Sequence, residues 1–205
     1  MFSGIVESVQ AITSVESHNH MVRIKIQKPN DFNDLKIGDS ISTNGVCLTL
    51  EAQTDAEMVF ALAAETLHVL RIDKNHLLGQ KMNLERSLRF GDRIHGHLVT
   101  GHVDSLGTVV KAEGTADSWF LDVKVASHLE ALIWKKGSIT LHGVSLTVND
   151  VKDGIVSVCL IPETLKRTNL GRLKVGDMVN VEPDYFAKAL VHQFGNKINE
   201  LRGSN

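Results

Sequence analysis

The chain has 205 residues, 42% of them hydrophobic, and a formal net charge of −2 at pH 7. This composition is that of a folded soluble protein, and the near-neutral charge argues against binding to nucleic acid or to an anionic membrane. The length accommodates one large domain or two domains of about 100 residues each.

Neither a targeting signal nor a disulfide framework is expected. Residues 1–7 contain no basic segment and no long apolar run, so we predict no signal peptide. No stretch of the sequence approaches the roughly 20 apolar residues of a membrane span. The two cysteines, Cys47 and Cys159, are too few for a disulfide framework, which favours a cytoplasmic protein.

A duplication organises the chain. The motif GVCLTL, which begins at Gly45, returns as GVSLTV at Gly143. Three further pairs of segments match in the same order and at nearly the same offset, namely residues 2–7 with 99–104, 65–67 with 163–165, and 83–85 with 180–182. The sequence therefore predicts two tandem domains, over residues 1–97 and 98–186.

Both halves carry β signals. Apolar and polar residues alternate over residues 22–26, 121–125 and 178–182, which is the period of a half-buried strand. One Gly-Asp turn sequence recurs at Gly38, Gly91 and Gly176. Short strands separated by turns predict an all-β fold, with a small closed barrel or a sandwich in each half. We also expect short helical turns at residues 76–80 and 168–173.

The tail has a different period. From Ala187 to Leu201, apolar residues recur every three or four positions, with polar residues on much of the opposite side. We predict an amphipathic helix within residues 187–205. This helix either packs on the second domain or pairs with copies from other subunits.

The repeated motif has two interpretations. A glycine in a β-favouring run marks a bulge or a close approach of backbone to something else. Alternation then places Cys47 and Thr49 on one face of the strand, and Val46 and Leu48 on the other. These residues are either packing positions of a duplicated β-domain or parts of two pockets with a similar shape.

Differences between the halves favour two pockets with unequal chemistry. At corresponding positions the first half has Ile5, Asn44, Cys47, Ala64 and Ser87, and the second has His102, His142, Ser145, Pro162 and Asp184. The ordinary pKa of histidine makes His102 the candidate for proton transfer. Simpler roles remain open: His102 as a surface or hydrogen-bonded residue, Cys47 as a small buried side chain, and Asp184 as a helix cap.

A metal site is not predicted. His95 and His97 share one face of an expected strand, and His102 and His142 are further candidates. Zinc needs three or four converging ligands with outer-shell support, for which these glycine-rich surroundings are a poor frame. The sequence also lacks CxxC and HExxH patterns, a phosphate-binding glycine loop and a nucleophile elbow.

Five stretches together resemble the riboflavin synthase family of the α-subunit type, which is built from lumazine-binding repeats: residues 1–7, 44–49, 96–103, 143–148 and 161–171. The resemblance covers nearly the whole chain in order. It implies two tandem six-stranded antiparallel Greek-key β-barrels related by internal duplication, a C-terminal α-helix, and a homotrimer held through these helices. Lumazine synthase is a further implied partner.

The resemblance also implies a reaction. A transferase of riboflavin biosynthesis would convert two molecules of 6,7-dimethyl-8-ribityllumazine into riboflavin and 5-amino-6-(D-ribitylamino)uracil. One substrate molecule would give a four-carbon unit to the other, with no cofactor. The site would lie between the first barrel of one subunit and the second barrel of a neighbour.

Substrate contacts follow from the same resemblance. In one set they are Cys47, Leu48, Thr49, Ala61, Leu62, Ala63, Ala64, Glu65 and Thr66, joined by Gly101, His102, Val103 and Lys136. In the other they are Gly4, Ile5, Val6, Ser145, Leu146, Thr147, Ile161, Pro162, Glu163, Thr164, Leu165 and Lys166. We expect His102 to move protons, Ser145 and Cys47 to position or activate the nucleophile, and Asp184 to orient one of them.

Two other functions compete with the enzyme. A non-catalytic lumazine- or flavin-binding antenna protein would share the fold, but such relatives tend to lose the cysteine and histidine that stand here as Cys47 and His102. A structural adaptor without a ligand would leave the repeated Glu-Thr and Cys/Ser-Leu-Thr faces unexplained. His95, His142 and the segment at 67–72 depart from the family pattern, so the region 67–80 and the second pocket stay open.

Overall fold

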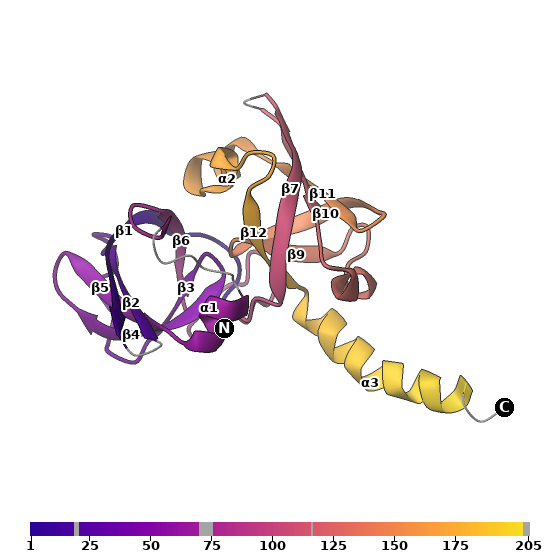
Figure 1. Cartoon of the computed structure of the whole chain (residues 1–205), viewed down its shortest axis with the longest axis horizontal. Coiled ribbons are helices and arrows are strands. Elements are labelled where there is room, and N and C mark those ends of the chain that lie inside the picture. Colours follow the sequence, from indigo (N-terminus) through magenta and orange to yellow (C-terminus); the bar gives the residue numbers. More distant parts are fainter. Residues whose placement is uncertain (19–20, 70–75, 116, 203–205) are drawn as a thin grey trace.

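The computed structural model describes residues 1–18, 21–69, 76–115 and 117–202. Two barrels stand side by side, and a long helix projects away from them (Figure 1). The first barrel closes in the strand order β1-β2-β5-β4-β3-β6, with every pair antiparallel. Its strands are β1 (Ser8–His18), β2 (Met21–Gln27), β3 (Ser40–Thr43), β4 (Val46–Gln53), β5 (Glu57–Leu62) and β6 (Lys81–Arg86).

The second barrel repeats the first. Its closed order β10-β11-β8-β7-β12-β9 is the same cycle of neighbours, with each strand six positions later. Its strands are β7 (Ser105–Gly114), β8 (Trp119–Lys124), β9 (Ser138–Leu141), β10 (Val144–Lys152), β11 (Ile155–Leu160) and β12 (Met178–Pro183). In each barrel three hairpin-connected strands are followed by one that returns beside the first of them, which is a Greek key. The predicted fold class is confirmed.

Apolar side chains at alternate positions of the strands point inward and fill each barrel. In β2 the inward residues Val22, Ile24 and Ile26 are buried, and the residues between them face outward. The first core gathers these with Leu50 and Phe60, and a separate core of the second barrel includes Leu121, Val123 and Val158. Burial of apolar surface stabilises the fold by roughly 25 cal/mol per Å² and is the main force that closes both barrels.

The three Gly-Asp turns are one structure used three times. Gly38, Gly91 and Gly176 all have φ of 96°. In each turn the following aspartate accepts a hydrogen bond from the backbone N–H three residues earlier, at 2.7 to 2.8 Å. The positive φ explains why glycine recurs, because side chains rarely adopt this conformation. The sequence prediction of a recurring turn is confirmed.

Several short helices were only partly anticipated. The turn expected at residues 168–173 contains the 3₁₀ helix η3 (Leu170–Arg172), and most of the 76–80 region lies outside regular elements. The structure adds α1 (Ala64–Val69), η2 (Ser127–Leu132) and α2 (Pro162–Arg167). Proline at the first helical position was the available signal for α2. The Glu-Thr pairs therefore lie on helical turns.

The glycines of the repeated motif lie in turns rather than in strands. Asn44 and Gly45 have φ of 48° and 82°, and they form the two-residue turn between β3 and β4. His142 and Gly143 repeat this turn between β9 and β10. The two turns meet: a Cβ on Gly143 would lie 2.6 Å from the Gly45 nitrogen. Of the two interpretations of these glycines, the bulge was wrong and the close approach of backbone is confirmed.

A buried polar network joins the barrels beside these turns. The amide of Asn83 donates to the His142 carbonyl and to Asn169, both at 2.9 Å. Asn180 donates its amide to the Asn44 carbonyl at 2.8 Å. His142 Nδ1 accepts the Asn180 backbone N–H at 3.1 Å. Burial lowers the pKa of His142 to about 4, so its imidazole is a neutral acceptor. His142 thus accepts the Asn180 backbone N–H in the same way as the Asn44 side chain accepts the Asn83 backbone N–H.

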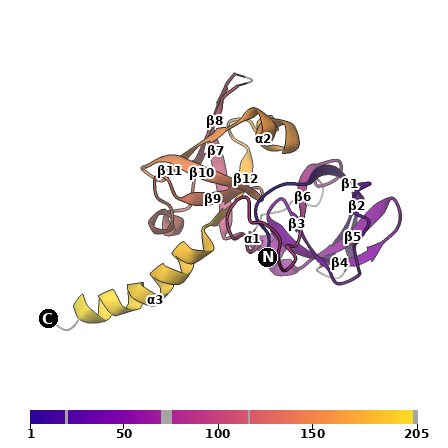
Figure 2. The same cartoon turned by 180° about the vertical axis from the view of Figure 1, so that it is seen from behind.

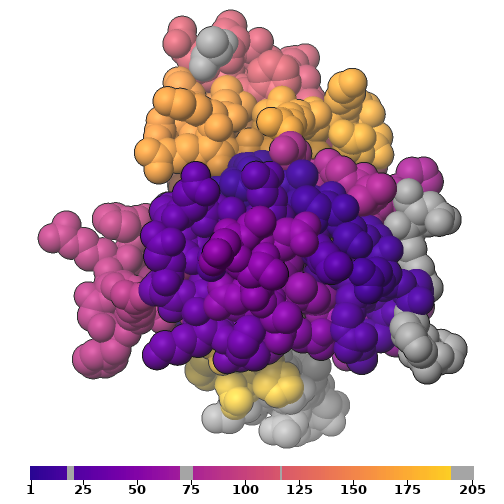
Figure 3. Space-filling view, turned by 90° about the vertical axis from the view of Figure 1, so that its left-hand side faces the viewer, coloured from indigo at the N-terminus to yellow at the C-terminus, as the bar shows by residue number. Residues whose placement is uncertain are grey.

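The C-terminal helix α3 (Tyr185–Arg202) begins two residues before the first apolar position noted in the sequence. It leaves the second barrel and extends into solvent, as the view from behind also shows (Figure 2). Viewed onto the first barrel, the described part of α3 emerges below that barrel (Figure 3). Among the described helices, none combines the length and apolar character needed to cross a membrane.

Candidate functional site

A pocket of about 270 Å³ lies where the two halves meet beside Cys47. Strand β4 contributes Cys47, and α1 contributes Glu65 and Thr66. The chain entering the second barrel contributes residues 101–103. The full lining is Val46, Cys47, Glu65, Thr66, Val69, Gly101, His102 and Val103. All of these except the two valines at 46 and 69 are predicted substrate contacts. The structure therefore brings together residues that are more than 50 positions apart in sequence.

Gly101 places His102 beside the thiol. The Cys47 backbone N–H donates to the Gly101 carbonyl at 2.9 Å. Gly101 has φ of 80°, and a Cβ there would lie 2.7 Å from the Cys47 Cβ. Only glycine allows this approach, which explains its place directly before His102. Cys47 is a half-buried free thiol and His102 is exposed, so both are accessible to a ligand in the pocket.

Other predicted contacts of the first half divide between core and surface. Leu48 and Leu62 are 5% and 3% exposed, and their side chains belong to the first core. Thr49, Ala63 and Ala64 are exposed. A ligand would therefore meet the two leucines through their backbone. Ala61 is half-buried near the end of β5, three residues before α1 begins.

Lys136 belongs to the second barrel. Its backbone N–H donates to the Val148 carbonyl at 2.8 Å, and its φ is 70°. Its assignment to the same set as Cys47 stays a prediction.

A second cluster surrounds Ser145. The Ser145 backbone N–H donates to the Gly4 carbonyl at 2.8 Å, and a Cβ on Gly4 would lie 2.6 Å from the Ser145 Cβ. Gly4 therefore packs on Ser145 in the same way as Gly101 packs on Cys47. The following residues differ in exposure, since Ile5 is 42% exposed and Val6 only 5%. Leu146 is buried in the second core, whereas Thr147 is exposed.

His97 was missed as a site residue. Its Nδ1 lies 2.7 Å from Ser145 Oγ, and its Nε2 lies 3.2 Å from Thr140 Oγ1. Burial lowers the pKa of His97, against the opposing charges of Asp184 and Glu182, so the imidazole is neutral at pH 7. A neutral imidazole beside a hydroxyl can accept its proton. The available signal was its place within residues 96–103, which carry the family resemblance.

The histidines at 95 and 97 lie in different surroundings. His95 is exposed, whereas His97 is half-buried against Ser145. A Cβ on the intervening Gly96 would lie 2.1 Å from the Ser3 carbonyl oxygen, so this glycine serves a close approach. Within the part of the chain that the structure describes, no three His, Cys, Asp or Glu side chains are grouped to hold a metal ion.

Asp184 caps the C-terminal helix. Its Oδ1 accepts the Phe186 backbone N–H at 2.8 Å, which is the simpler of the two roles considered for it. Its charge also acts on His97, so it lies near the Ser145 cluster. A catalytic role of Asp184 stays a prediction.

The remaining predicted contacts lie around α2 at the end of β11. Ile161 precedes the helix and is 59% exposed, Pro162 begins it, and Glu163 pairs with Arg167 along it. Pro162 and Glu163 are exposed, and Thr164 and Leu165 are half-buried. Lys166 is exposed in the last turn. An exposed isoleucine above half-buried residues is suited to cover a planar ring.

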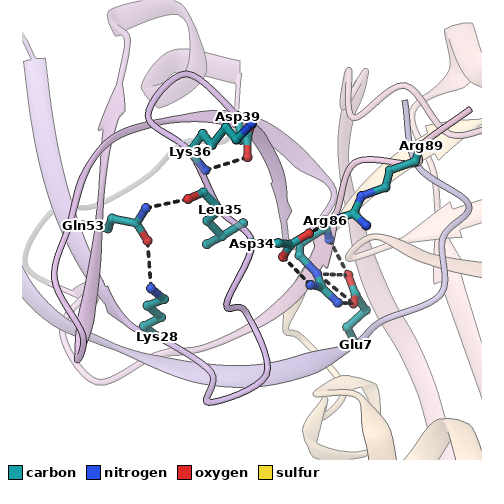
Figure 4. Close-up of polar contacts among 9 residues, drawn as sticks. All are labelled: Glu7, Lys28, Asp34, Leu35, Lys36, Asp39, Gln53, Arg86 and Arg89. Atoms are coloured by element: carbon teal, nitrogen blue, oxygen red, sulfur yellow. Dashed lines mark hydrogen bonds and ion pairs between the residues drawn. The ribbon is translucent and has the colours of Figure 1, made fainter.

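An arginine of β6 anchors the segment after Ile5 and Val6. Arg86 donates to both carboxylate oxygens of Glu7, with Nη2 at 2.5 Å from Oε2, and to Asp34 at 2.6 Å (Figure 4). Its guanidinium lies 4.6 Å from the centre of the Phe32 ring. Figure 4 also shows Arg89 turned toward Asp34, with which it forms an ion pair. These contacts line a charged pocket of about 480 Å³ that includes Ile5.

Comparisons with known proteins agree with this geometry. The family model described as "Lumazine binding domain" matches twice, at residues 3–87 and 100–184. The chain is 37% identical to riboflavin synthase of Photobacterium leiognathi over 93% of this chain and 87% of that protein. It is 38% identical to riboflavin synthase of Chlamydia muridarum, with 93% of each covered. It is 33% identical to riboflavin synthase of Bacillus subtilis, over 98% of this chain and 92% of that protein.

Solved structures show the same fold. A crystal structure of LumP complexed with riboflavin superposes with a TM-score of 0.82 at 26% sequence identity, covering 89% of this chain and 99% of that one. The lumazine binding domain matches both barrels, and three riboflavin synthases at 33 to 38% identity are covered over at least 87% of their length, so the chain belongs to the riboflavin synthase family.

Proposed function

We propose that this chain catalyses the dismutation of two 6,7-dimethyl-8-ribityllumazine molecules into riboflavin and 5-amino-6-(D-ribitylamino)uracil. This four-carbon transfer is the last step of riboflavin biosynthesis. The observation that carries the proposal is the pocket in which Cys47 and His102, contributed by different halves, face the same space. Imidazole and thiol are suited to the proton transfer and nucleophilic addition that the reaction needs, without a cofactor.

The roles of the two clusters follow from their chemistry. His102 removes a proton from the methyl group of one bound lumazine, and the thiol of Cys47 positions or activates the nucleophile. In the second cluster Ser145 has His97 as a proton acceptor at 2.7 Å, so its hydroxyl is the better activated of the two. Asp184 orients this pair through its charge. Holding two rings in a reactive orientation supplies a further large share of the acceleration.

A carrier protein is the second candidate, because LumP has the same fold as this chain. Two observations favour the enzyme. Cys47 and His102 are both present and line one pocket. The relatives of similar length, at 33 to 38% identity, are riboflavin synthases.

Incubation with 6,7-dimethyl-8-ribityllumazine alone separates the candidates. We expect riboflavin absorbance and fluorescence to appear without any added cofactor, and 5-amino-6-(D-ribitylamino)uracil to appear in equal amount. A stable spectral shift without product identifies a carrier and contradicts the proposal. No spectral change excludes both candidates.

A homotrimer is part of the proposal. Helix α3 exposes one apolar stripe to solvent, formed by Phe186, Leu190, Val191 and Phe194, each at least 45% exposed. Such a stripe on a helix that extends away from its barrel needs a partner. Copies of α3 would cover one another and bring the Cys47 pocket of one subunit to the Ser145 cluster of the next.

The mass of the assembly tests the trimer. Sedimentation of the native chain is expected to give three times the mass of one subunit, and Leu190→Glu is expected to give single subunits with little turnover. His192→Glu places a carboxylate at an exposed position on the opposite side of the helix, about 200° around from Leu190, and should leave the mass unchanged. A native single subunit with full activity would refute this arrangement.

Domain limits, localisation and a further partner complete the proposal. We place the domains at residues 1–97, 98–186 and 187–205. The two half-buried free thiols are compatible with a reducing cytoplasm. Association with lumazine synthase, which would supply the substrate, can be checked by co-sedimentation of the two purified proteins.

A further inference from the structure

Two short segments cross between the barrels and pair with each other. The first crossing segment is residues 2–6 and the second is residues 97–103. Phe2 and Val99 exchange backbone hydrogen bonds at 2.8 and 3.0 Å, and the His97 N–H donates to the Ser3 carbonyl at 3.2 Å. The first segment reaches Ser145 on the second barrel through Gly4. The second reaches Cys47 on the first barrel through Gly101.

One buried glutamate holds each crossing segment. Glu182 on β12 accepts three hydrogen bonds: from the Thr100 N–H at 2.9 Å, the Thr100 hydroxyl at 2.6 Å and the Gly101 N–H at 3.1 Å. Glu85 on β6 accepts the same three donors from Ser3 and Gly4, at 2.7, 2.8 and 3.0 Å. The two glutamates are 1% and 4% exposed. Hydrogen bonds to a carboxylate are stronger than those between neutral groups, so they hold both segments in place.

The glutamates act from the opposite barrel. Glu182 belongs to the second barrel, but the segment it holds delivers His102 to Cys47 of the first. Glu85 belongs to the first barrel, but its segment delivers Gly4 to Ser145 of the second. Neither glutamate lines the Cys47 pocket. A carboxylate that touches no ligand but fixes the backbone under a site residue acts by positioning it.

The strand register explains how each glutamate reaches its segment. Glu182 pairs with Thr140, and Thr140 pairs with Ser145, across β12, β9 and β10. Directly opposite residues share a face of the barrel wall. Glu85, Ser42 and Cys47 form the same row in the first barrel. Each row therefore places a carboxylate at one end and the reactive thiol or hydroxyl at the other, with a crossing segment lying over it.

We propose that Glu182 and Glu85 are positioning residues of the two sites, each fixing from one barrel the backbone segment that completes the site on the other. The expected effect on catalysis rests on the function proposed above, whereas the positioning of the two segments does not. Each site is then assembled from both barrels, so neither barrel alone carries a complete site.

The thiol of Cys47 offers a readout that does not depend on turnover. In a Cys159→Ser background Cys47 is the only thiol, since the chain has two cysteines. Glu182→Gln replaces one acceptor oxygen by an amide that faces a donor, which loosens Gly101 over Cys47. Labelling of Cys47 by a thiol reagent is expected to accelerate roughly tenfold, the effect of one lost hydrogen bond to a charged group. Glu85→Gln, which holds the other segment, is the matched control and should leave the labelling rate unchanged.

Activity gives the second readout. Glu182→Gln is expected to lower kcat roughly 100-fold, the cost of a displacement of about 1 Å at a reacting group. KM should change far less, because Glu182 does not touch the ligand. Thr100→Val removes one of the three donors to Glu182 and also the oxygen that accepts the His102 N–H, while it leaves the carboxylate in place. It should show the same two effects to a smaller degree, which covers the case in which Glu182→Gln fails to fold.

The pH profile is the readout for Glu85. Burial raises the pKa of Glu85 to about 7. Below that pH its carboxyl gains a proton that faces an N–H or hydroxyl donor, and the first crossing segment loosens. The charged groups that share its pocket are Glu7, Asp34, Arg86, Arg89, Asp92, Arg93 and His95. Activity of the native chain is expected to fall below pH 7. Glu85→Gln is expected to be low throughout and to fall less steeply on acidification, because only the protonation of the catalytic histidine then contributes.

The outcomes are distinct. Unchanged Cys47 labelling together with an unchanged kcat in Glu182→Gln overturns the positioning role. If Glu182→Gln accelerates the labelling of Cys47 but the native chain makes no riboflavin, the positioning of the segment is supported while the proposed function fails. Equal acceleration in Glu182→Gln and Glu85→Gln indicates general loosening of the fold and also overturns the proposal.

Discussion

Replacing His102 by glutamine is expected to lower kcat by roughly 100-fold to 10,000-fold, the range that a general acid–base residue supplies. His102 is exposed at the pocket that Cys47 also lines, and its backbone is fixed by Gly101 and by the Thr100 hydroxyl at 3.2 Å. Glutamine keeps the size and a hydrogen-bonding end but cannot exchange a proton near neutral pH. Riboflavin should therefore bind nearly as well as to the native chain.

Stopped-flow absorbance gives the rate, and quenching of riboflavin fluorescence gives the binding. His128→Gln, at an exposed position in η2, is the matched control and should leave the rate unchanged. Cys47→Ser should also lower turnover, whereas Cys159→Ser on β11 should not. Full activity in both His102→Gln and Cys47→Ser would remove these two residues from the mechanism.

Alanine at Gly143 is expected to destabilise the chain by about 2–5 kcal/mol. A side chain at φ of 79° costs about 1–2 kcal/mol in strain. The new Cβ would lie 2.6 Å from the Gly45 nitrogen, a backbone atom of the opposite barrel that cannot move alone. Such overpacking costs about 1–3 kcal/mol more.

Comparison with Gly176→Ala separates the steric part of this loss from the backbone strain. Gly176 has φ of 96° in the same barrel, but a Cβ there meets nothing within 4 Å. This control should lose only the strain, about 1–2 kcal/mol. Urea unfolding followed by tryptophan fluorescence reports on the second barrel, since both tryptophans, Trp119 and Trp134, lie in its chain segment. Equal midpoints for Gly143→Ala and Gly176→Ala would show that the two turns do not press on each other.

The architecture was predictable because its signals are local and repeated. Alternation over residues 22–26 requires only that one face of a strand be buried, and β2 covers that range with its inward residues buried. The Gly-Asp turns depend on a backbone conformation that few residues adopt. The short helices α1 and α2 escaped because six residues leave too little pattern to recognise.

The site was predictable only in part. Cys47, Glu65 and His102 came from the comparison of the halves and from the family resemblance, and they line one pocket. His97 escaped because its contact with Ser145 depends on how the crossing segments pass between barrels, which no local pattern encodes. Glu85 and Glu182 escaped for the same reason, since a glutamate within a strand resembles any outward residue until its partner segment is known.

The meeting of Gly45 and Gly143 has a consequence for how the two copies can drift apart. Each glycine fills the space that a side chain on the other would need, so neither position tolerates a change that the other could compensate. Both turns therefore keep glycine at this position, while two residues further along, thiol and hydroxyl are free to differ. A duplicated protein can in this way specialise one site against the other and still keep the backbone contact between its halves unaltered.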